Sequence, residues 1–290
     1  MRVKKAGSGC RILSYLAFQH PHISAEVWKK ALRSGELLRH GRPATHDDIL
    51  AAGDQLTHVV PNTVEPPVNP SLRVLAEDLS VMIFAKPAPL PVHPSGRFNR
   101  NSAVMILRAA FPELRLRPVH RLDANTTGVL LLAKNREAAH RLGQEFAAQQ
   151  VSKVYLVRVC GLPRHDDFEC SVPIGRTKRD AGTRDAGGPG ARAAYTHFTV
   201  RHRDEQSKTS LLEVRPRSGR TNQIRIHLAE LGLTIIGDNA YGERRDLGSG
   251  LSQAQTLCLH AWQLEFVHPG HGRTCHIEAP PPPWAHGSLP

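Results

Sequence analysis

The chain has 290 residues, which suits one large domain or a large and a small one. Lysine and arginine total 38 and aspartate and glutamate 26, so the formal net charge is +12 and favours a polyanionic partner, nucleic acid before membrane. No apolar run approaches the roughly 20 residues that cross a bilayer, and the five cysteines lack C-x-x-C spacing. We therefore expect a protein of the reducing cytoplasm with neither a membrane segment nor a metal site. Composition leaves open RNA, DNA or a merely basic chain from an arginine-rich proteome.

The first 60 residues predict a small α+β unit. An apolar stripe predicts a helix before Pro21, and its residues are Ile12, Leu13, Tyr15, Leu16 and Phe18. Ser24 is a good N-cap for a second helix over 25–32. A strand and tight turn over 36–43 and a strand within 48–60 complete the unit.

This order of elements resembles the small S-four-like RNA-binding domain, which is named after a ribosomal protein. The resemblance implies that basic side chains contact RNA phosphates, and the candidates are Lys29, Lys30, Arg33, Arg39 and Arg42. The alternative is that these residues form an ordinary solvated helix face. Residues 61–71 hold four prolines and predict an extended linker, so a second domain would cover residues 72–290.

The expected elements of this second domain mix strands and helices. We predict strands over 81–85, 129–133, 153–161, 195–201, 209–214, 259–268 and 274–278. We predict helices over 102–110 and 136–150 and a third that ends before Gly232, with Ile224, Leu228 and Leu231 on its apolar side. Residues 175–192 are rich in Gly and Arg and predict a flexible basic loop or a disordered insertion.

One aspartate stands in a polar turn. Asp123 follows His120, Arg121 and Leu122, and turn-forming residues lead from it into the apolar strand at 129–133. Such a carboxylate would lie at the mouth of a sheet, open to a cleft. On this stretch alone a turn or cap role is the simpler interpretation, because Asp before Asn-Thr-Thr-Gly is good turn chemistry.

The same stretch resembles the active-site signature of a known enzyme family. Residues 120–128, followed by Ala133 and Lys134, are similar to the H-R-L-D-x-x-T-S-G…A-K pattern of the RluA-type pseudouridine synthases. Thr127 stands where the family usually has serine, and both residues carry a hydroxyl.

Further segments extend the resemblance over about residues 72–280. Residues 86–96 are similar to K-P-x-G-x-x-V-H-P-S-G, with Pro89 in place of glycine. Residues 153–161 follow the family's K-x-Y-x-x-x-V-x-G pattern. Residues 217–228 resemble T-G-R-T-H-Q-I-R-x-H-L, with Asn222 in place of histidine. The last two segments, which are similar to G-D-x-x-Y-G and L-H-A-x-x-L-x-F-x-H-P, are 237–242 and 259–269.

The resemblance implies an α+β catalytic domain on a mostly antiparallel mixed sheet with flanking helices. It also implies isomerisation of uridine to pseudouridine in structured RNA, a reaction that needs no cofactor or metal. Asp123 would attack the ribose as a nucleophile or stabilise positive charge on it. Arg225 would pair with Asp123 and keep it ionised. Tyr155 would lie against the base and act in a proton transfer.

The target uridine must leave its stack, which costs a few kcal/mol. The resemblance implies that Arg121 fills the vacated space or holds phosphates, whereas the plainer alternative is a surface salt bridge. The other side chains expected to bind the substrate are His120, Thr126, Lys153, Arg220 and Gln223.

We expect a monomer that acts on large-subunit ribosomal RNA, because of the S-four-like domain, with transfer RNA as the second choice. One alternative is a non-catalytic RNA-binding or ribosome-assembly protein of the same fold, which the departures at Thr127, Asn222 and Pro89 leave open. A DNA-binding protein is the other alternative, although no helix-turn-helix or zinc signature is present.

Overall fold

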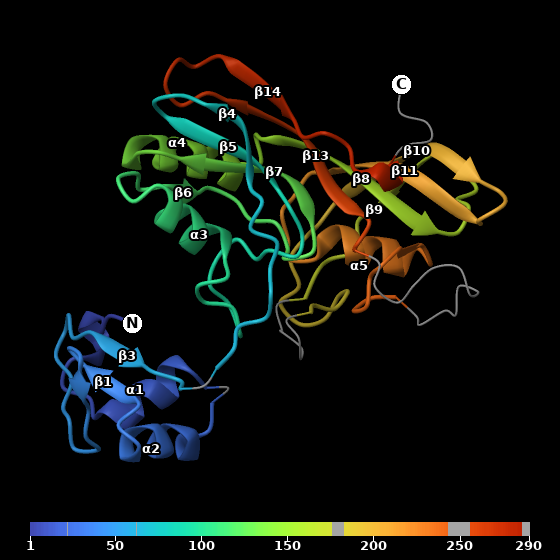
Figure 1. The fold of residues 1–290 in the computed structure, drawn as a ribbon. Coiled ribbons are helices and arrows are strands. Elements are labelled where there is room, and N and C mark those ends of the chain that lie inside the picture. The colour runs from blue at the N-terminus through green and yellow to red at the C-terminus, as the bar shows by residue number, and fades with distance from the viewer. Residues whose placement is uncertain (22, 62, 176–182, 243–255, 286–290) are drawn as a thin grey trace. The chain divides into compact units, whose positions relative to one another are not determined.

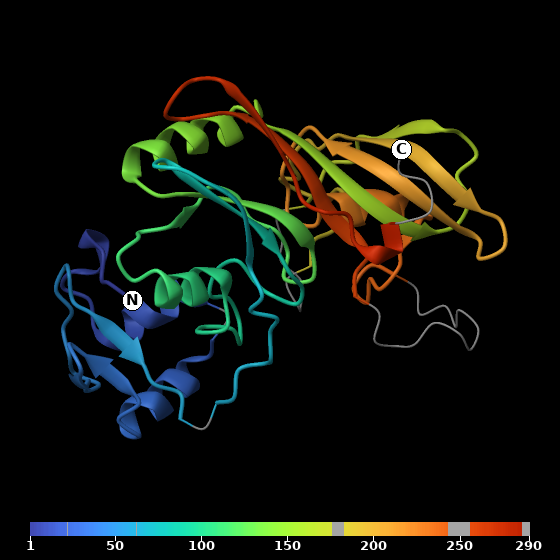
Figure 2. The same ribbon diagram turned by 45° about the horizontal axis from the view of Figure 1, so that its top comes forward.

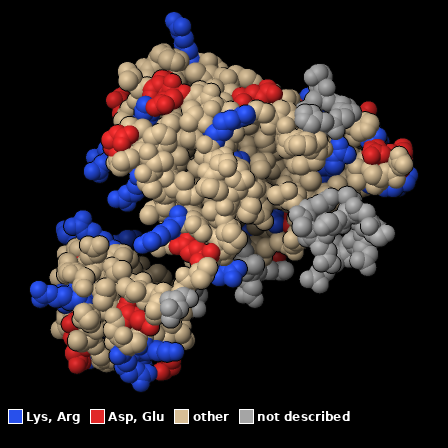
Figure 3. All heavy atoms as spheres, viewed as in Figure 1, with Lys and Arg blue, Asp and Glu red and all other residues tan. Residues whose placement is uncertain are grey.

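A computed structural model describes residues 1–21, 23–61, 63–175, 183–242 and 256–285. The chain divides into two compact units, Met1–Val64 and Glu65–Pro290 (Figure 1). Within the described residues, none of the helices combines the length and apolar character needed to span a membrane. In Figure 3, Lys and Arg side chains lie in separate groups on the visible face of each unit, with Asp and Glu among them.

Unit 1 packs two helices against a short antiparallel sheet. Helices α1 (Ile12–Gln19) and α2 (Ala25–Arg33) follow a 3-10 turn, η1 (Lys5–Gly7). The sheet has the order β2-β1-β3, and its strands are β1 (Leu37–Arg39), β2 (Arg42–Pro43) and β3 (Leu56–His58). The predicted order of elements is therefore present, although the last strand is shorter than expected.

The predicted apolar stripe of α1 is wrong at one position. Ile12, Tyr15 and Leu16 are buried, but Phe18 is 80% exposed. A residue two positions after Leu16 lies about 200° further around the helix, so Phe18 points away from the face that Leu16 buries. Phe18 is thus a surface residue of unit 1.

Unit 2 is built on one large mixed sheet (Figures 1 and 2). Its strands follow the order β4-β5-β7-β13-β8-β11-β10-β9, while β6 pairs with β7, β12 with β8 and β14 with β13. All of these pairs are antiparallel except β7 with β13, which is parallel. The strands are β4 (Arg73–Glu77), β5 (Val81–Lys86), β6 (Arg117–Pro118), β7 (Thr127–Ala133), β8 (Ser152–Cys160), β9 (Asp167–Cys170), β10 (Thr196–Asp204), β11 (Thr209–Pro216), β12 (Thr234–Ile235), β13 (Leu259–Val267) and β14 (Thr274–Glu278).

The observed architecture confirms the expected α+β fold with a mostly antiparallel mixed sheet. The predicted hairpin at 195–214 is present as β10 and β11. The short strands β4, β6, β9 and β12 were not predicted. The predicted loop at 175–192 lies partly outside the described residues, and its described part forms isolated bridges from Ala186 and Arg192 to Ile174, which precedes the loop.

Helices cover both faces of the sheet. Alternate residues of β5 and β7 point to opposite sides, as a strand requires. Ile83 and Leu131 pack with α4 (Arg136–Ala147), whereas Phe84 and Leu130 pack with α3 (Ala103–Ala110). Both views show α3 and α4 on the two sides of this part of the sheet (Figures 1 and 2). A continuous apolar run such as Val129–Ala133 is therefore the expected sequence of a strand buried on both faces.

The third helix, α5 (Gln223–Glu230), packs on the other half of the sheet. Ile224 and Leu228 join the core formed with β8 and β11, but Leu231 is 40% exposed and lies beyond the last helical residue. The predicted stripe is thus wrong at its last position, because the helix ends one residue before Leu231. Gly232 follows with a φ of 72°, in agreement with its predicted role as a helix stop. The chain closes with a 3-10 turn, η3 (Pro283–Ala285).

Candidate active site

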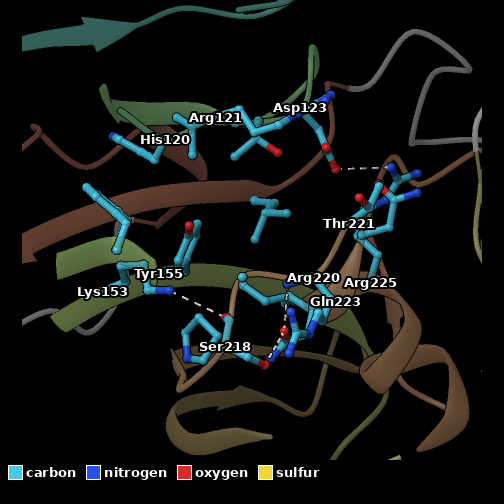
Figure 4. A pocket seen from close by; sticks show the side chains of 18 of the residues that line it. His120, Arg121, Asp123, Lys153, Tyr155, Ser218, Arg220, Thr221, Gln223 and Arg225 are labelled. Carbon is cyan, nitrogen blue, oxygen red and sulfur yellow. Dashed lines mark hydrogen bonds and ion pairs between the residues drawn. The ribbon is translucent and has the colours of Figure 1, made fainter. Parts of the chain in front are cut away.

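A cavity of about 360 Å³ opens between the segment before β7, strand β8 and the start of α5 (Figure 4). Asp123 comes from the first segment, Tyr155 from β8 and Arg225 from α5, so three distant parts of the chain meet there. The remaining predicted site residues line the same cavity, and these are His120, Arg121, Thr126, Lys153, Arg220 and Gln223. A concave site of this size with converging polar groups suits a small ligand or a single nucleobase.

Arg225 interacts with two carboxylates, those of Asp238 and Asp123. Its guanidinium donates two hydrogen bonds to Asp238, at 2.6 and 2.7 Å, and a third nitrogen lies 3.6 Å from the Asp123 carboxylate. The ring of Tyr241 stacks under the guanidinium at 4.9 Å. Burial alone would raise the pKa of the Asp238 carboxyl, but the hydrogen bonds and charge of Arg225 lower it below its ordinary value. Asp238 is therefore a fixed anion that orients Arg225.

Tyr155 is on strand β8 and lines the same cavity as Asp123 and Arg225. Burial raises the pKa of its phenol, and the negative charge of Asp123 raises it further. The phenol is thus protonated at neutral pH and is able to donate a proton or a hydrogen bond. Its strand is paired on both sides, with Val214 and Ala261 as the register partners of Tyr155, so the ring has a rigid base.

A buried lysine braces the turn that carries Asp123. Lys86 is 2% exposed and its ammonium donates to the carbonyls of Pro87, Leu90 and Ala124, at 2.9, 2.7 and 3.2 Å. Three acceptors match the three donors of an ammonium group. Burial lowers the pKa of Lys86 to about 7, and the nearby charge of Asp123 opposes that shift. The segment similar to K-P-x-G is therefore the support of the Asp123 turn.

The far end of that turn is held by a histidine. Thr127 Oγ1 lies 2.8 Å from His260 Nδ1, and the two residues are register partners in the parallel pair of β7 and β13. His260 is 4% exposed, and burial lowers its pKa to about 4. A serine or threonine hydroxyl makes the same contact, which explains why Thr127 fits the position usually held by serine.

Gly128 permits the closest approach of these two strands. Its φ is 115°, and a Cβ at this position would lie 2.1 Å from the carbonyl oxygen of Ala261. Only glycine adopts this backbone conformation without strain and leaves room for the neighbouring chain. The residue therefore fixes the distance between the Asp123 turn and β13.

Two predicted substrate-binding residues have partners within the protein. His120 Nε2 accepts the backbone N–H of Leu131 at 3.0 Å, and its ring stacks on Phe146 at 4.9 Å. Burial, aided by the charge of Lys153, lowers the pKa of His120 to about 3, so the ring is neutral. These contacts support a positioning role for His120.

Gln223 likewise uses its full hydrogen-bonding capacity. Its Oε1 accepts from the Ser218 hydroxyl and the Arg220 backbone, and its Nε2 donates to the Tyr195 carbonyl and to Thr196 Oγ1. The four bonds, of 2.7 to 3.0 Å, tie the loop before α5 to β10. Gln223 thus shapes the cavity wall and has no donor or acceptor left for a substrate.

Among the other predicted residues, the three cations are more open than Thr126. Arg121 is exposed, Lys153 contacts the Ser218 carbonyl at 3.4 Å, and the Arg220 side chain donates to Ala193 at 3.2 Å. Burial lowers the pKa of Lys153 below its ordinary value. Thr126 is 2% exposed and forms part of the cavity wall. Arg121 and Lys153 are consequently the cations best placed to meet an incoming anion.

Sequence reasoning missed Asp238, Lys86 and His260. Asp238 was interpreted as a turn residue, and its carboxylate does accept the backbone N–H groups of Ala240 and Tyr241. Its ion pair with Arg225 was therefore not predicted. Asn222, to which no catalytic role was assigned, adopts the left-handed conformation that Asn tolerates well and donates to the Tyr241 hydroxyl at 2.9 Å. The signal for all of them was present in the segments that resembled the family, but their partners are distant in sequence.

Comparison with known sequences bears on what the cavity does. A family described as RNA pseudouridylate synthase matches residues 80–230, which include Asp123, Tyr155 and Arg225. The chain belongs to the RluA-type RNA pseudouridine synthase family. This pseudouridine synthase is an RNA-modifying isomerase, which confirms the predicted enzyme class.

Its relatives include named ribosomal enzymes. The synthase is 32% identical to ribosomal large subunit pseudouridine synthase C of Vibrio cholerae, across 94% of this chain and 90% of the relative. It is 33% identical to ribosomal large subunit pseudouridine synthase D of Xanthomonas campestris, across 97% and 88% of the two chains.

Solved structures agree on the fold. Human RNA pseudouridylate synthase domain containing 1 superposes with a TM-score of 0.63 at 24% identity, over 78% of this chain and 94% of that one. Human RNA pseudouridylate synthase domain containing 4 has a TM-score of 0.59 at 25% identity, over 73% and 90%.

Proposed function

We propose that Asp123 carries the isomerisation, that Arg225 pairs with its carboxylate, and that Tyr155 supports the base and its proton. The single observation behind this proposal is that these three side chains line one cavity, with Asp123 3.6 Å from Arg225. The carboxylate attacks the ribose or stabilises its positive charge while the bond from ribose to base nitrogen breaks. The base then turns and its carbon bonds to the ribose, which breaks any bond from the ribose to Asp123 and frees the carboxylate. That carbon loses a proton as the nitrogen gains one, so the product is an isomer.

The cavity would receive one uridine that has left its stack. Side chains at the rim of the cavity would contact the RNA around this uridine. Arg121 is exposed beside Asp123, where its side chain would fill the vacated space or hold a phosphate. Lys153 and Arg220 would attract the backbone on the opposite rim. His120 and Gln223, with their internal partners, would keep the shape of the cavity.

The substrate that the observations favour is large-subunit ribosomal RNA. The two relatives named above carry that substrate in their names and align with more than nine-tenths of this chain, unit 1 included. Unit 1 would act as an S-four-like RNA-binding domain. Arg39 is tied to Asp54 at 2.8 Å and Lys29 to Glu26 at 2.7 Å, so Lys30 and Arg42 would be the more available phosphate contacts there.

Asp123→Asn tests the catalytic assignment. We expect pseudouridine formation to fall below detection while RNA affinity and thermal stability stay near wild type, because Arg225 keeps its two bonds to Asp238. Asp166→Asn, which removes an exposed carboxylate, is the matched control and should remain fully active. Normal turnover by Asp123→Asn would refute the role of Asp123.

Carbodiimide mapping of total RNA from cells with and without the protein tests the substrate. We expect a pseudouridine signal in large-subunit ribosomal RNA to disappear with the protein and to return with the wild-type chain but not with Asp123→Asn. A signal lost from transfer RNA instead would overturn the proposed substrate and leave the catalytic assignment standing.

A further inference from the structure

A second cavity of unit 2, also of about 360 Å³, lies outside the active site. It is formed by α3 and by the segment that leads from α3 into β6, and its lining residues are Val104, Arg108, Pro112, Leu114, Arg115, Leu116 and Arg117. Arg108 lies one turn after Val104 on α3, so both point to the same side of the helix. We name this cavity the arginine pocket.

The three guanidiniums of the arginine pocket have no anionic partner in the part of the chain that the structure describes. Arg108, Arg115 and Arg117 have no carboxylate within 4.0 Å among the described residues, although Glu113 lies in the same connection. Their side chains make a single hydrogen bond within the described parts of the chain, from Arg117 to the Arg115 carbonyl at 2.8 Å. Each guanidinium has five N–H donors, so most donors of this cluster are free for a ligand.

Grouped arginines without acids favour an anion. Their mutual repulsion falls when a negative group binds among them, and the planar fork of arginine fits phosphate oxygens in pairs. Val104, Leu114 and Leu116 are partly buried lining residues of the pocket, whereas Arg108 and Arg115 are exposed. Long arginine stems are able to lie along such apolar surface while their charged heads stay in water. This chemistry matches a phosphodiester better than a metal ion or an apolar ligand.

The position of the arginine pocket connects it with the substrate. Arg117 belongs to β6, and the chain continues through Val119 and His120 to Arg121, all three of which line the active-site cavity. Four residues of extended chain span at most about 14 Å, so one RNA strand is able to reach both places. The two sites lie in succession along a single segment.

We propose that the arginine pocket binds backbone phosphates of the RNA substrate beside the target uridine and thereby extends the RNA footprint of the synthase. The inference uses the RNA-modifying activity of the family and does not depend on which RNA is modified, because phosphate contacts are independent of sequence. The pocket acts on affinity and takes no part in the chemistry.

Substitution of the three arginines together tests this inference. The protein R108Q/R115Q/R117Q is titrated with an unmodified transcript of the host's large-subunit ribosomal RNA at about 50 to 200 mM monovalent salt. Each lost phosphate contact lowers the slope of log affinity against log salt by about 0.7–0.9, so we expect a decrease of about 2 to 3 and a raised KM. The turnover at saturating RNA should stay within about twofold of wild type.

Two controls separate charge from folding. R108K/R115K/R117K keeps the charges and should keep most of the salt slope, whereas Arg164→Gln removes an exposed arginine from the turn before β9 and should change nothing. An unchanged slope in the triple glutamine protein would overturn the inference. So would weaker binding with an unchanged slope, since it would mean that no phosphate contact was lost. The slope reports on phosphate contacts even if the proposed ribosomal target is wrong.

Discussion

Asp238 holds the guanidinium of Arg225 through hydrogen bonds of 2.6 and 2.7 Å, whereas Asp123 lies 3.6 Å from it. The two carboxylates therefore have different tasks. Asp238 is 1% exposed at its side chain and is fully committed to orienting the arginine, while Asp123 is 26% exposed and looser. This difference fits the proposed roles, in which Asp123 reacts with the ribose and Arg225 is held in place beside it.

Asp238→Asn should reduce turnover with little effect on RNA affinity. The change removes the charge that orients Arg225, and a misplacement of about 1 Å near the reacting atoms costs about 100-fold in rate. Breaking a buried pair should also cost about 3 kcal/mol of stability. We would measure kcat and KM well below the unfolding temperature, together with urea unfolding.

The control for this change is Asp166→Asn, which breaks a 2.6 Å bond to Arg203 at the surface. Exposed pairs contribute less than about 1 kcal/mol, so activity and stability should hardly change. Wild-type turnover by a folded Asp238→Asn protein would show that the orientation of Arg225 is not set by Asp238.

Gly128→Ala should prevent folding or destabilise the protein by more than about 4 kcal/mol. A methyl group there would meet the Ala261 carbonyl oxygen at 2.1 Å, on backbone that resists movement, and the φ of 115° adds strain. Gly143→Ala is the matched control, because Gly143 lies inside α4 with nothing within 4 Å of a Cβ. That change should stabilise the protein by about 0.5–1 kcal/mol. Equal effects of the two changes on thermal unfolding would contradict the close approach of β7 and β13.

Stability should fall between pH 6.5 and pH 4 because of His260. The unfolded chain binds a proton near pH 6.5, whereas the folded protein does so only near pH 4, where burial has placed the pKa of His260. Between these values the unfolded state holds more protons, so the free energy of unfolding decreases as the pH falls. For His260, the difference of 2.5 pKa units corresponds to a loss of about 3 kcal/mol in the free energy of unfolding. This loss is complete at pH 4 and absent above pH 6.5. His120, whose pKa is about 3, contributes a loss of similar size over the same range and extends it to lower pH.

Urea unfolding across this range measures the effect. His260→Asn should be less stable at neutral pH, because the contact with Thr127 is altered, and should lose about half of the pH dependence, since His120 keeps its share. His165→Asn, which changes an exposed histidine, should keep the wild-type dependence. A loss of stability in His260→Asn as large as that of the wild type would assign the effect to other groups.

The sequence predicted best those features that depend on a short contiguous segment of the chain. Val129–Ala133 predicted a buried strand, and the segments around Asp123, Tyr155 and Arg225 predicted the residues that line the cavity, because each segment carries its own pattern. The parallel pairing of β7 with β13 was not predictable, since the partners lie more than 130 residues apart and no local signal specifies the register. Asp238 was missed for a different reason, because one carboxylate serves both a turn and an ion pair.

Helix faces show the same limit. Phe18 and Leu231 continue apolar patterns in the sequence, yet both are exposed, since α1 turns Phe18 away from the core and α5 ends before Leu231. An apolar pattern indicates which residues are able to be buried. The length and direction of the helix then decide which of them are.

Glu65 marks the place at which the chain can be shortened safely. Its carboxylate accepts three successive backbone N–H groups, from Asn99, Arg100 and Asn101 at 2.9, 2.8 and 2.7 Å. A truncated enzyme that starts at Leu72, where the composition suggested the domain begins, would lose this clasp and free the loop that leads into α3. A cut ahead of Glu65 keeps these three hydrogen bonds. The proline-rich stretch is therefore a linker only before Glu65, and from Glu65 onward it belongs to the catalytic unit.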